Sequence, residues 1–443
     1  MTFQHPYIPT TDAEEQEMLA AMGIKNFDEL VKIIPDDLRL KEAFGLQAPK
    51  SEIEVAAELA RLANRNRPAT QAACFIGGGA YDHYTPAAVQ AIAMRSEFYT
   101  AYTPYQAEVS QGTLQVMYEF QTMIAEISGF EVANASLYDG ASAAAEACSM
   151  AMAITKKNRL LLPETVFPHT RRVIETYMQN RGAEIVTVAS RNGLLDGADL
   201  KAKADGAACA IVQSPNMLGL VENWHSAREA LGDALLIASA DPLALGLLEA
   251  PGNFDADIYI GEGQSLGIPL SFGGPYLGLM ATKKKYIRRM PGRIVGKTVD
   301  LDGRPAYTMV LRAREQDIRR EKATSNICTN QGLMALWATI YLSLLGKQGH
   351  TKLARLCFDK SQYLGQAIDK LPGYEVPFGF GYVKEEVVRT PVPADELVAA
   401  ADKADFNLAT IEWQGEKLLQ LAVTEQRTRE EIDRLIEYLK TYN

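Results

Sequence analysis

Three short segments carry residue types that can bind an anion, stack on a flat ring or pair with a protonated ring nitrogen. The first contains Gly140 and Ser142, which follow the apolar run Val132–Tyr138 and precede a long predicted helix. Small residues at a helix start let backbone N–H groups approach a phosphate, and the helix dipole favours its charge. A start of this kind also serves as simple helix capping. Both interpretations stay open for this segment alone.

The second and third segments place a histidine and an aspartate after later apolar runs. His169 follows the run Asn158–Leu162, where an imidazole could stack on an aromatic cofactor, although a lone histidine is more often a structural residue. Asp241 follows the run Ala234–Ser239. Its carboxylate could pair with a pyridinium nitrogen, but an Asx-turn before a proline is at least as common an explanation.

The order of these segments is more informative than any one of them. An anion loop, a ring-stacking histidine and an aspartate, in this order, are expected of an aminotransferase-like (fold type I) pyridoxal-phosphate domain. The arrangement predicts a Schiff-base lysine soon after the next strand, Ala256–Ile260. The chain has no lysine between Lys203 and Lys283, and Ser265 stands at the expected place. We therefore expect a vestigial cofactor pocket, without its covalent anchor, formed by Gly140, Ser142, His169 and Asp241.

Alternating strands and helices must position this pocket. Short apolar runs alternate with helical stretches from about residue 70, which predicts βαβ units, a mainly parallel sheet and ligands bound at the carboxyl ends of its strands. The pattern changes after about Pro305. We expect an N-terminal helical extension (1–68), a large α/β domain (69–305) and a smaller C-terminal α+β domain (306–443). The predicted strands are Ala73–Gly77, Val132–Tyr138, Asn158–Leu162, Ala183–Val188, Ala208–Val212, Ala234–Ser239, Ala256–Ile260, Tyr276–Ala281, Leu408–Trp413 and Leu418–Val423.

Predicted helices complete the two ends of the chain. Capping boxes of Ser51 with Glu54 and of Thr428 with Glu431 mark two helix starts. The other terminal helices are expected over Asp12–Met22, Asn26–Ile34, Gln331–Leu345 and Gly349–Leu371.

Composition excludes several classes of protein. The 443 residues contain 45 Lys and Arg against 55 Asp and Glu, and this acidic balance argues against a nucleic-acid binder. No apolar stretch approaches the roughly 20 residues of a membrane span, and Met1–Asp12 does not resemble a secretory signal. The five cysteines are widely spaced and form no CxxC pair, so neither a disulfide framework nor a metal site is expected, and a reducing cytoplasmic location fits best.

Longer segments carry a family resemblance. The sequences of Phe75–Pro86, Glu97–Gln115, Pro269–Pro275 and Thr324–Gln331 resemble the P-protein family of the glycine cleavage system. Within that family, the chain is similar over essentially its whole length to the alpha subunits (subunit 1) of glycine dehydrogenase (decarboxylating). One mild departure is Ala107, where the family often has proline.

The resemblance implies an enzyme built from two similar subunits. A beta subunit would hold pyridoxal phosphate on its lysine, glycine would lose CO2, and the aminomethyl group would pass to the lipoyl arm of the H-protein. The chain alone would be inactive, and the implied assembly has two alpha and two beta subunits. The missing lysine agrees with the alpha assignment.

One polar and aromatic segment is expected to belong to a shared substrate and cofactor site at the subunit interface. Aromatic rings bury area at an interface while their hydroxyls find hydrogen bonds, and packing in the core beside a helix is the alternative. The residues are Tyr99, Thr100, Tyr102, Tyr105, Gln106, Gln111 and His83. Two rival hypotheses stay open for the whole chain, namely a self-sufficient enzyme that uses a displaced lysine such as Lys283, and a subunit that only scaffolds its partner.

Overall fold

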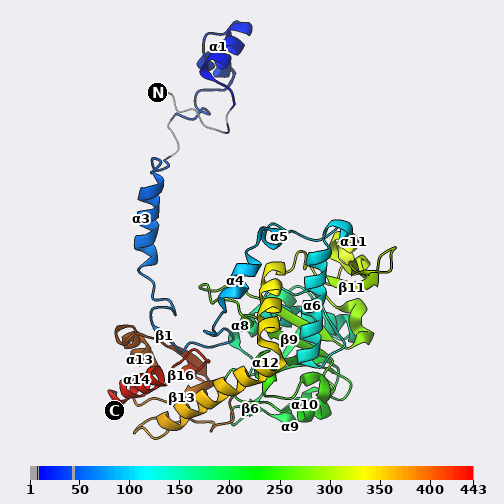
Figure 1. Cartoon of the computed structure of the whole chain (residues 1–443), viewed down its shortest axis with the longest axis vertical. Coiled ribbons are helices and arrows are strands. Elements are labelled where there is room, and N and C mark those ends of the chain that lie inside the picture. Colours follow the sequence, from blue (N-terminus) through cyan, green and yellow to red (C-terminus); the bar gives the residue numbers. More distant parts are fainter. Residues whose placement is uncertain (1–6, 8, 42–44, 443) are drawn as a thin grey trace. The chain divides into compact units, whose positions relative to one another are not determined.

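The computed structural model describes residues 7, 9–41 and 45–442 of the chain. Two parts of the expected N-terminal extension lie outside the described residues. They are residues 1–6 and 8, in the segment expected to lack a secretory signal, and residues 42–44. Two compact units, Met1–Asn66 and Arg67–Asn443, make up the fold. Figure 1 shows the helices and strands of each unit, coloured along the sequence.

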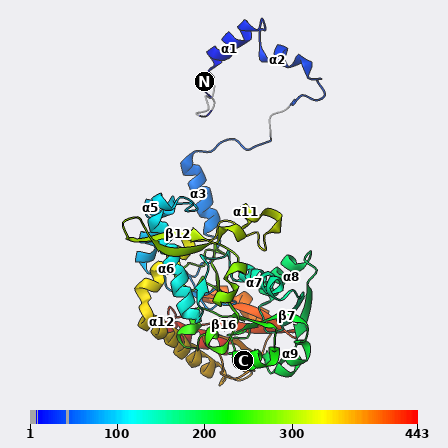
Figure 2. The same cartoon turned by 90° about the vertical axis from the view of Figure 1, so that its right-hand side faces the viewer.

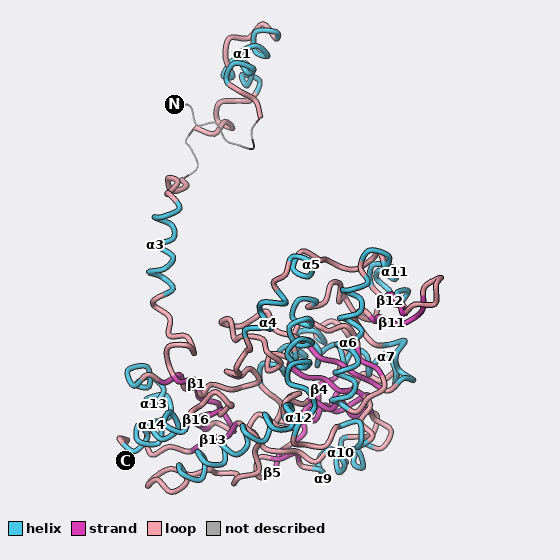
Figure 3. Tube along the Cα trace, in the orientation of Figure 1, coloured by secondary structure: helices cyan, strands magenta, loops and turns pink. Residues whose placement is uncertain are grey.

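Helices and loops form the described part of the first unit (Figure 3). Its helices are α1 (Asp12–Ala21), α2 (Phe27–Leu30) and α3 (Glu52–Ala63). The expected capping box at the start of α3 is confirmed, because the Ser51 side chain accepts from the Glu54 backbone and the Glu54 side chain accepts from the Ser51 backbone. The second expected helix is shorter than predicted and continues as a 3-10 turn over Val31–Ile33.

The second unit is built around a seven-stranded sheet with the order β2-β10-β9-β8-β7-β3-β4. Only β10 runs antiparallel to its two neighbours, so the predicted mixed, mainly parallel sheet is confirmed. The strands are β2 (Val132–Ala133), β3 (Arg159–Pro163), β4 (Glu184–Val188), β7 (Ala207–Gln213), β8 (Leu235–Ser239), β9 (Ile258–Glu262) and β10 (Gly278–Thr282).

Helices cover both faces of this sheet (Figure 2). Along β8, Leu236 and Ala238 join a core with α6, α10 and α12, whereas Leu235 and Ile237 join a second core with α7 and α8. Burial on both faces explains why residues 235–238 of β8 are all apolar rather than alternating with polar residues. The helices of this part are α4 (Ala87–Ala93), α5 (Ser96–Tyr99), α6 (Gln111–Ser128), α7 (Gly140–Thr155), α8 (Pro168–Met178), α9 (Gly197–Lys203), α10 (Trp224–Leu231) and α11 (Gln316–Arg319).

A three-stranded antiparallel sheet, ordered β13-β16-β15, forms the C-terminal part. Its strands are β13 (Glu385–Val388), β15 (Ala409–Trp413) and β16 (Glu416–Ala422), and it packs with α13 (Ala394–Ala401) and α14 (Arg429–Lys440). The two helices expected before it form one element, α12 (Gly332–Ile368), interrupted at Gly346 by backbone with φ 62° and ψ 174°. Glycine adopts this conformation without a steric penalty.

Two local features differ from the sequence prediction. The run expected over Ala73–Gly77 does not enter the large sheet, because β1 (Ala73–Cys74) pairs in parallel with β14 (Phe406–Asn407). The antiparallel pair of β11 (Ile294–Val299) and β12 (Pro305–Val310) was not expected, and a boundary after residue 305 would separate its two strands. The division of the second unit at that residue therefore stays a proposal.

Two further properties bear on the class of protein. Among residues 7, 9–41 and 45–442, no helix has both the length and the apolar character needed to cross a bilayer. All five cysteines are free, and Cys328 is exposed while the other four are buried.

Candidate functional site

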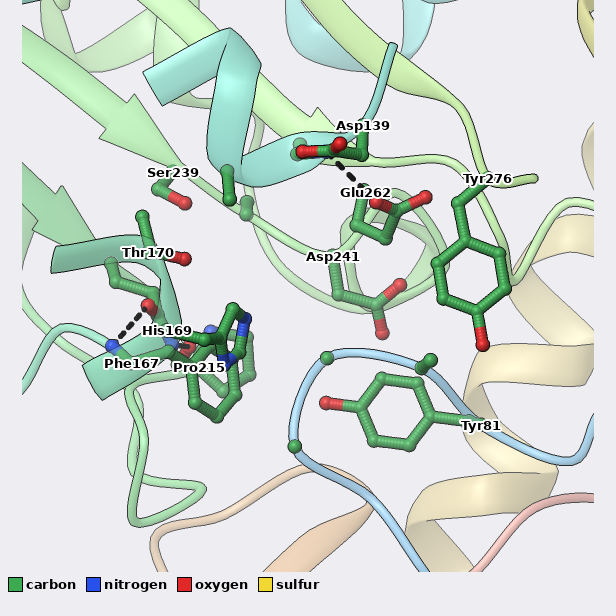
Figure 4. A pocket seen from close by; sticks show the side chains of 18 of the residues that line it. Tyr81, Asp139, Phe167, His169, Thr170, Pro215, Ser239, Asp241, Glu262 and Tyr276 are labelled. Carbon is green, nitrogen blue, oxygen red and sulfur yellow. Dashed lines mark hydrogen bonds between the residues drawn. The ribbon is translucent and has the colours of Figure 1, made fainter. Parts of the chain in front are cut away.

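A cavity of about 320 Å³ opens at the carboxyl ends of β7, β8 and β9. The loop 78–81, the start of α7, residues 167–170, and Lys384 and Glu385 beside β13 complete its walls. Figure 4 shows Asp241 and Glu262 projecting from neighbouring strand ends toward Tyr81 and Tyr276. Of the residues expected in a vestigial pocket, Gly140, His169 and Asp241 line this cavity.

Asp241 has close partners at both carboxylate oxygens. Its Oδ2 lies 2.6 Å from Lys384 Nζ, and its Oδ1 accepts from Ser265 Oγ at 3.1 Å and from the Leu243 N–H at 3.1 Å. Burial alone would raise the pKa of Asp241, but the charge and hydrogen bond of Lys384 outweigh burial, and the net pKa is lowered. The residue that stands where a Schiff-base lysine is expected, Ser265, is therefore a hydrogen-bond partner of this aspartate.

Lys384 links Asp241 to a second buried group. Its Nζ lies 3.0 Å from His83 Nε2, and His83 Nδ1 lies 2.7 Å from Glu425 Oε2. Burial, followed by the nearby ammonium, lowers the pKa of His83, so the ring is neutral, accepts from Lys384 and donates to Glu425. The ammonium also lies 3.7 Å from the centre of the Tyr81 ring. The structure thus joins His83 to the Asp241 cavity, although the sequence analysis grouped it with the tyrosine-rich segment.

A carboxylate occupies the start of α7, where the sequence analysis expects an anion. Glu262 Oε2 accepts from the Gly140 N–H at 2.8 Å, and its Oε1 accepts from the backbone N–H groups of Gln264 and Leu277 at 2.9 and 3.1 Å. A Cβ at residue 140 would lie 3.0 Å from Glu262 Cβ, so glycine is what lets the helix start approach this strand end. Burial raises the pKa of Glu262 to about 7 against these three hydrogen bonds.

Ser142 has a capping role rather than a place on the cavity wall. Its backbone N–H donates to Asp139 Oδ1 at 2.8 Å, and its hydroxyl accepts from the Asp139 N–H at 3.1 Å. This reciprocal pair is a capping box. Two of the first three N–H groups of α7 therefore donate to carboxylates of the chain itself.

The loop before Tyr81 brings another carboxylate to the cavity. Glu385 accepts from the Gly78 N–H at 2.5 Å and from the Tyr81 hydroxyl at 2.8 Å. A Cβ at Gly77 would lie 2.1 Å from Glu385 Oε1, so only glycine allows this approach. Burial raises the pKa of Glu385 to about 7.

This arrangement does not fit pyridoxal phosphate. The N-terminus of α7 already binds Glu262, and Asp241 is already paired with Lys384. The ring of His169 stacks on Phe167, with centroids 5.1 Å apart and planes at 21° (Figure 4). Lys283, the displaced lysine of the self-sufficient hypothesis, does not line the cavity, and its ammonium contacts Asp255 and Asp257.

The tyrosine-rich segment lies outside the cavity wall and exposes large aromatic side chains. Tyr99, Tyr102 and Tyr105 are 56%, 75% and 48% exposed, and Gln106 is also exposed. The Tyr102 hydroxyl accepts from Thr329 Oγ1 at 3.1 Å, which ties the segment to a second region of family resemblance. Exposed rings in such number are typical of an interaction surface.

Hydrogen bonds of three side chains hold this segment in place. Arg293 is 2% exposed, donates to the Tyr105 hydroxyl at 3.2 Å and also donates to the Cys328 carbonyl. Thr100 Oγ1 donates to the Ser96 carbonyl at 2.6 Å. The Gln111 side chain donates to the Tyr307 carbonyl and accepts from its N–H, both at 2.9 Å, so its amide secures β12 rather than facing solvent.

The sequence did not identify Glu262, Lys384 and Glu385 as residues that line the cavity. Glu262 is a carboxylate at the end of an apolar strand, and that position is a signal that could have identified it. Lys384, Glu385 and Glu386 form a run of three charges that resembles a solvated surface, yet all three are buried. His83, Cys357 and Glu425 also bring potential metal ligands within 4.8 Å of one another. The neighbouring Lys384 ammonium opposes a cation there, and the expectation of no metal stays a prediction.

A family model and two relatives relate this chain to the same group of proteins. The family model described as "Glycine cleavage system P-protein" matches residues 5–439. A protein of Prosthecochloris aestuarii named "Probable glycine dehydrogenase (decarboxylating) subunit 1" is 49% identical, over 98% of this chain and 99% of that relative. A protein of the same name from Chloroherpeton thalassium is 47% identical, over 98% and 99% of the two chains.

Solved structures agree in fold. A crystal structure of glycine decarboxylase (P-protein) of the glycine cleavage system, in inhibitor-bound form, has a TM-score of 0.87 and 40% identity, over 99% of this chain and 100% of that chain. Glutamate decarboxylase of Lactobacillus brevis has a TM-score of 0.70 at 10% identity, over 92% and 95% of the two chains, and shares the fold alone. The pyridoxal-phosphate-dependent fold type I architecture expected from the sequence is thereby confirmed.

Proposed function

The chain belongs to the glycine cleavage system P-protein family, and from this premise we propose that it is the lysine-less alpha subunit of a two-subunit glycine dehydrogenase (decarboxylating). Its partner is a beta subunit that holds pyridoxal phosphate on a lysine. The pair decarboxylates glycine and transfers the aminomethyl group to the lipoyl arm of the H-protein. The assembly contains two alpha and two beta subunits and works in the cytoplasm.

The observation that carries this proposal is that the cofactor-like cavity lacks a lysine anchor and is lined by charged side chains that pair with one another or with the backbone. The chain lacks a lysine between residues 203 and 283, and its own Glu262 and Lys384 occupy the polar positions of the cavity. A chain of this family without a usable cofactor pocket needs a second chain to supply one. The name "subunit 1" of the relatives agrees with that requirement.

The contribution of this chain is a surface that completes the partner's site. Pyridoxal phosphate, held by the partner, supplies the electron sink for carbon–carbon bond cleavage. Tyr99, Tyr102 and Gln106 are exposed and clustered in sequence, and they can cover a small substrate pocket without adding net charge. Glycine has no side chain to recognise, so selectivity depends on its carboxylate, its amine and the exclusion of water and larger groups.

The internal contacts of the segment fit this role. Arg293 and Thr329 donate to the hydroxyls of Tyr105 and Tyr102, so these two side chains are held in position before a partner arrives. Donors that are held in place before the reaction stabilise developing charge without reorganisation at the moment of reaction.

Co-expression with and without the lysine-bearing partner tests the proposal. Glycine–CO2 exchange is expected only in the co-expressed sample, and the two chains are expected to elute together from a sizing column. A subunit interface of this kind commonly buries more than about 2,000 Å², so the complex should survive dilution. Exchange catalysed by this chain alone, or strictly separate elution of the two chains, would rule the proposal out.

A further inference from the structure

We propose that Glu262 and Lys384 replace the phosphate and the ring nitrogen of the cofactor inside this chain's own cavity, so that the cavity excludes phosphorylated cofactors altogether. This goes beyond the missing lysine, because a pocket without a Schiff base can still bind a phosphorylated pyridine non-covalently. The inference concerns the chain without its partner and does not depend on the proposed heteromer.

The position suited to a phosphate is filled by a carboxyl group that is tethered to the chain. Glu262 accepts from the first N–H group of α7 and from two further backbone N–H groups, with donor–acceptor distances of 2.8 to 3.1 Å. A helix N-terminus gains its anion affinity from such unpaired N–H groups. Once a tethered carboxylate satisfies them, a free phosphate must displace a group that cannot diffuse away.

The start of α7 and the end of β9 also lie close together, which leaves little space for a phosphate between them. A Cβ built on Gly140 would lie 3.0 Å from Glu262 Cβ and 3.1 Å from its Cα. The start of α7 therefore rests directly on the end of β9.

The charge of the cavity wall also opposes a phosphate monoester. Asp139, Glu262 and Glu385 line it, and burial raises the pKa of the two glutamates to about 7, so above neutral pH their negative charges face the interior. Lys384 is the cation among the lining residues, all of which the structure describes, and its ammonium lies 2.6 Å from Asp241. A phosphate dianion would meet like charges without a free counter-charge.

The position that a pyridinium nitrogen would take beside Asp241 is also occupied by a group of this chain, the Lys384 ammonium. A pyridinium nitrogen would need an oxygen of Asp241, but Oδ2 is already ion-paired with Lys384 and Oδ1 already accepts from Ser265 and the Leu243 N–H. Lys384 is held further by His83 and by the face of Tyr81. These contacts connect the start of β13 to the ends of the parallel strands, so side chains on the cavity wall join the two sheets.

Equilibrium dialysis of the full chain against pyridoxamine 5′-phosphate tests the inference, because this probe has no aldehyde to react with surface lysines. We expect no saturable binding by the wild-type chain up to about 1 mM probe. Glu262→Ala, and Glu262→Ala combined with Lys384→Met, are expected to gain binding by at least about 10-fold, a change equivalent to one power of ten in the dissociation constant. The matched control Glu412→Ala, which removes an exposed carboxylate on β15, is expected to bind as little as the wild type.

A second variant and a second probe complete the test. Glu262→Gln keeps the shape of the side chain and removes its charge, and it is expected to gain less binding than Glu262→Ala. Pyridoxamine without phosphate is expected to show no gain in either variant, which identifies the phosphate position as the one that opens. Saturable one-to-one binding of the phosphorylated probe by the wild type overturns the inference. So does an absence of gain in variants whose thermal melting matches that of the wild type.

Discussion

Lys384 Nζ and Asp241 Oδ2 lie 2.6 Å apart, although the two residues adjoin strands of different sheets. Asp241 follows β8 of the parallel sheet, and Lys384 immediately precedes β13 of the antiparallel sheet. Both side chains are largely buried, so each charge depends mainly on the other for its stabilisation. A buried pair of this kind is expensive to break from one side.

Removing one member of the pair should therefore destabilise the fold. Lys384→Met is expected to lower the free energy of unfolding by about 3–5 kcal/mol, because it leaves Asp241 charged and buried. Lys384→Met combined with Asp241→Asn should recover much of that loss. The control is Lys417→Met, whose exposed partner is Asp395 and whose loss should be below about 1 kcal/mol. Urea denaturation of the four proteins measures the differences, and equal losses for the single and double variants would contradict the prediction.

The exposed tyrosine segment should affect turnover without affecting assembly. Tyr102→Phe and Gln106→Ala are each expected to lower glycine–CO2 exchange on the order of 10²-fold when assembled with the partner, because each removes an exposed polar group that is proposed to donate into the partner's site. Tyr363→Phe, which changes a tyrosine hydroxyl bonded to Asp433 on α14, serves as the control with unchanged exchange. Cofactor absorbance and elution volume should stay as in the parent. Variants that assemble and turn over normally would show that the segment only packs at the interface.

The buried carboxyl group of Glu386 should make the free energy of unfolding decrease as the pH rises. Burial raises the pKa of Glu386 to about 8, compared with an unfolded value near 4.5. The folded chain therefore binds the proton more tightly, and stability is full below about pH 4.5 and decreases as the pH rises toward 8. Glu386→Gln is expected to remove this contribution and to raise stability at pH 8 by on the order of 1–3 kcal/mol. Melting curves at several pH values, with Glu412→Gln as the exposed control, check the sign.

Arg293 should position the tyrosine segment from beneath. Lysine cannot reproduce its donation to both the Cys328 carbonyl and the Tyr105 hydroxyl, because it lacks the planar fork of donors. Arg293→Lys is expected to increase amide exchange of residues 99–111 about 10-fold or more, with a smaller effect on β8. Arg304→Lys, at an exposed site, is the control. Unchanged exchange in the segment would mean that other contacts hold it.

The lysines of this chain should remain free of cofactor. Borohydride reduction of the assembled enzyme, followed by mass spectrometry, is expected to show a pyridoxyl adduct on the partner and none on this chain. The gap between Lys203 and Lys283, and the ion pairs of Lys283 with Asp255 and Asp257, are the reasons. A stoichiometric adduct on any lysine of this chain would overturn the alpha assignment.

Local patterns in the sequence were sufficient for the main architecture. Continuous apolar runs such as β8 identify strands buried on both faces, and residues at the ends of such strands meet at one edge of a parallel sheet. This is why Gly140, His169 and Asp241, which lie far apart in sequence, line one cavity. The capping boxes at Ser51 and Thr428 are local as well, and the structure contains both.

Long-range pairing accounts for what could not be predicted. Lys384 looks like a surface residue until Asp241 and His83 are brought beside it. The short strand Ala73–Cys74 has the composition of a large-sheet strand, and nothing nearby in sequence indicates that β14 is its partner. Periodicity reports which face of an element is buried but not which distant segment buries it.

The pairing of β1 with β14 has a consequence for synthesis of the chain. Arg67 bonds to Asp405, a residue 338 positions away, and the adjoining strands pair in register just beyond them. On a ribosome the segment after Arg67 emerges early, at roughly 5–20 residues per second. It must then wait on the order of half a minute for its partner strand at that speed. During that interval its apolar residues, including Phe75, lack their final neighbours in the C-terminal part, so this exposed segment is where newly made chains can associate with one another.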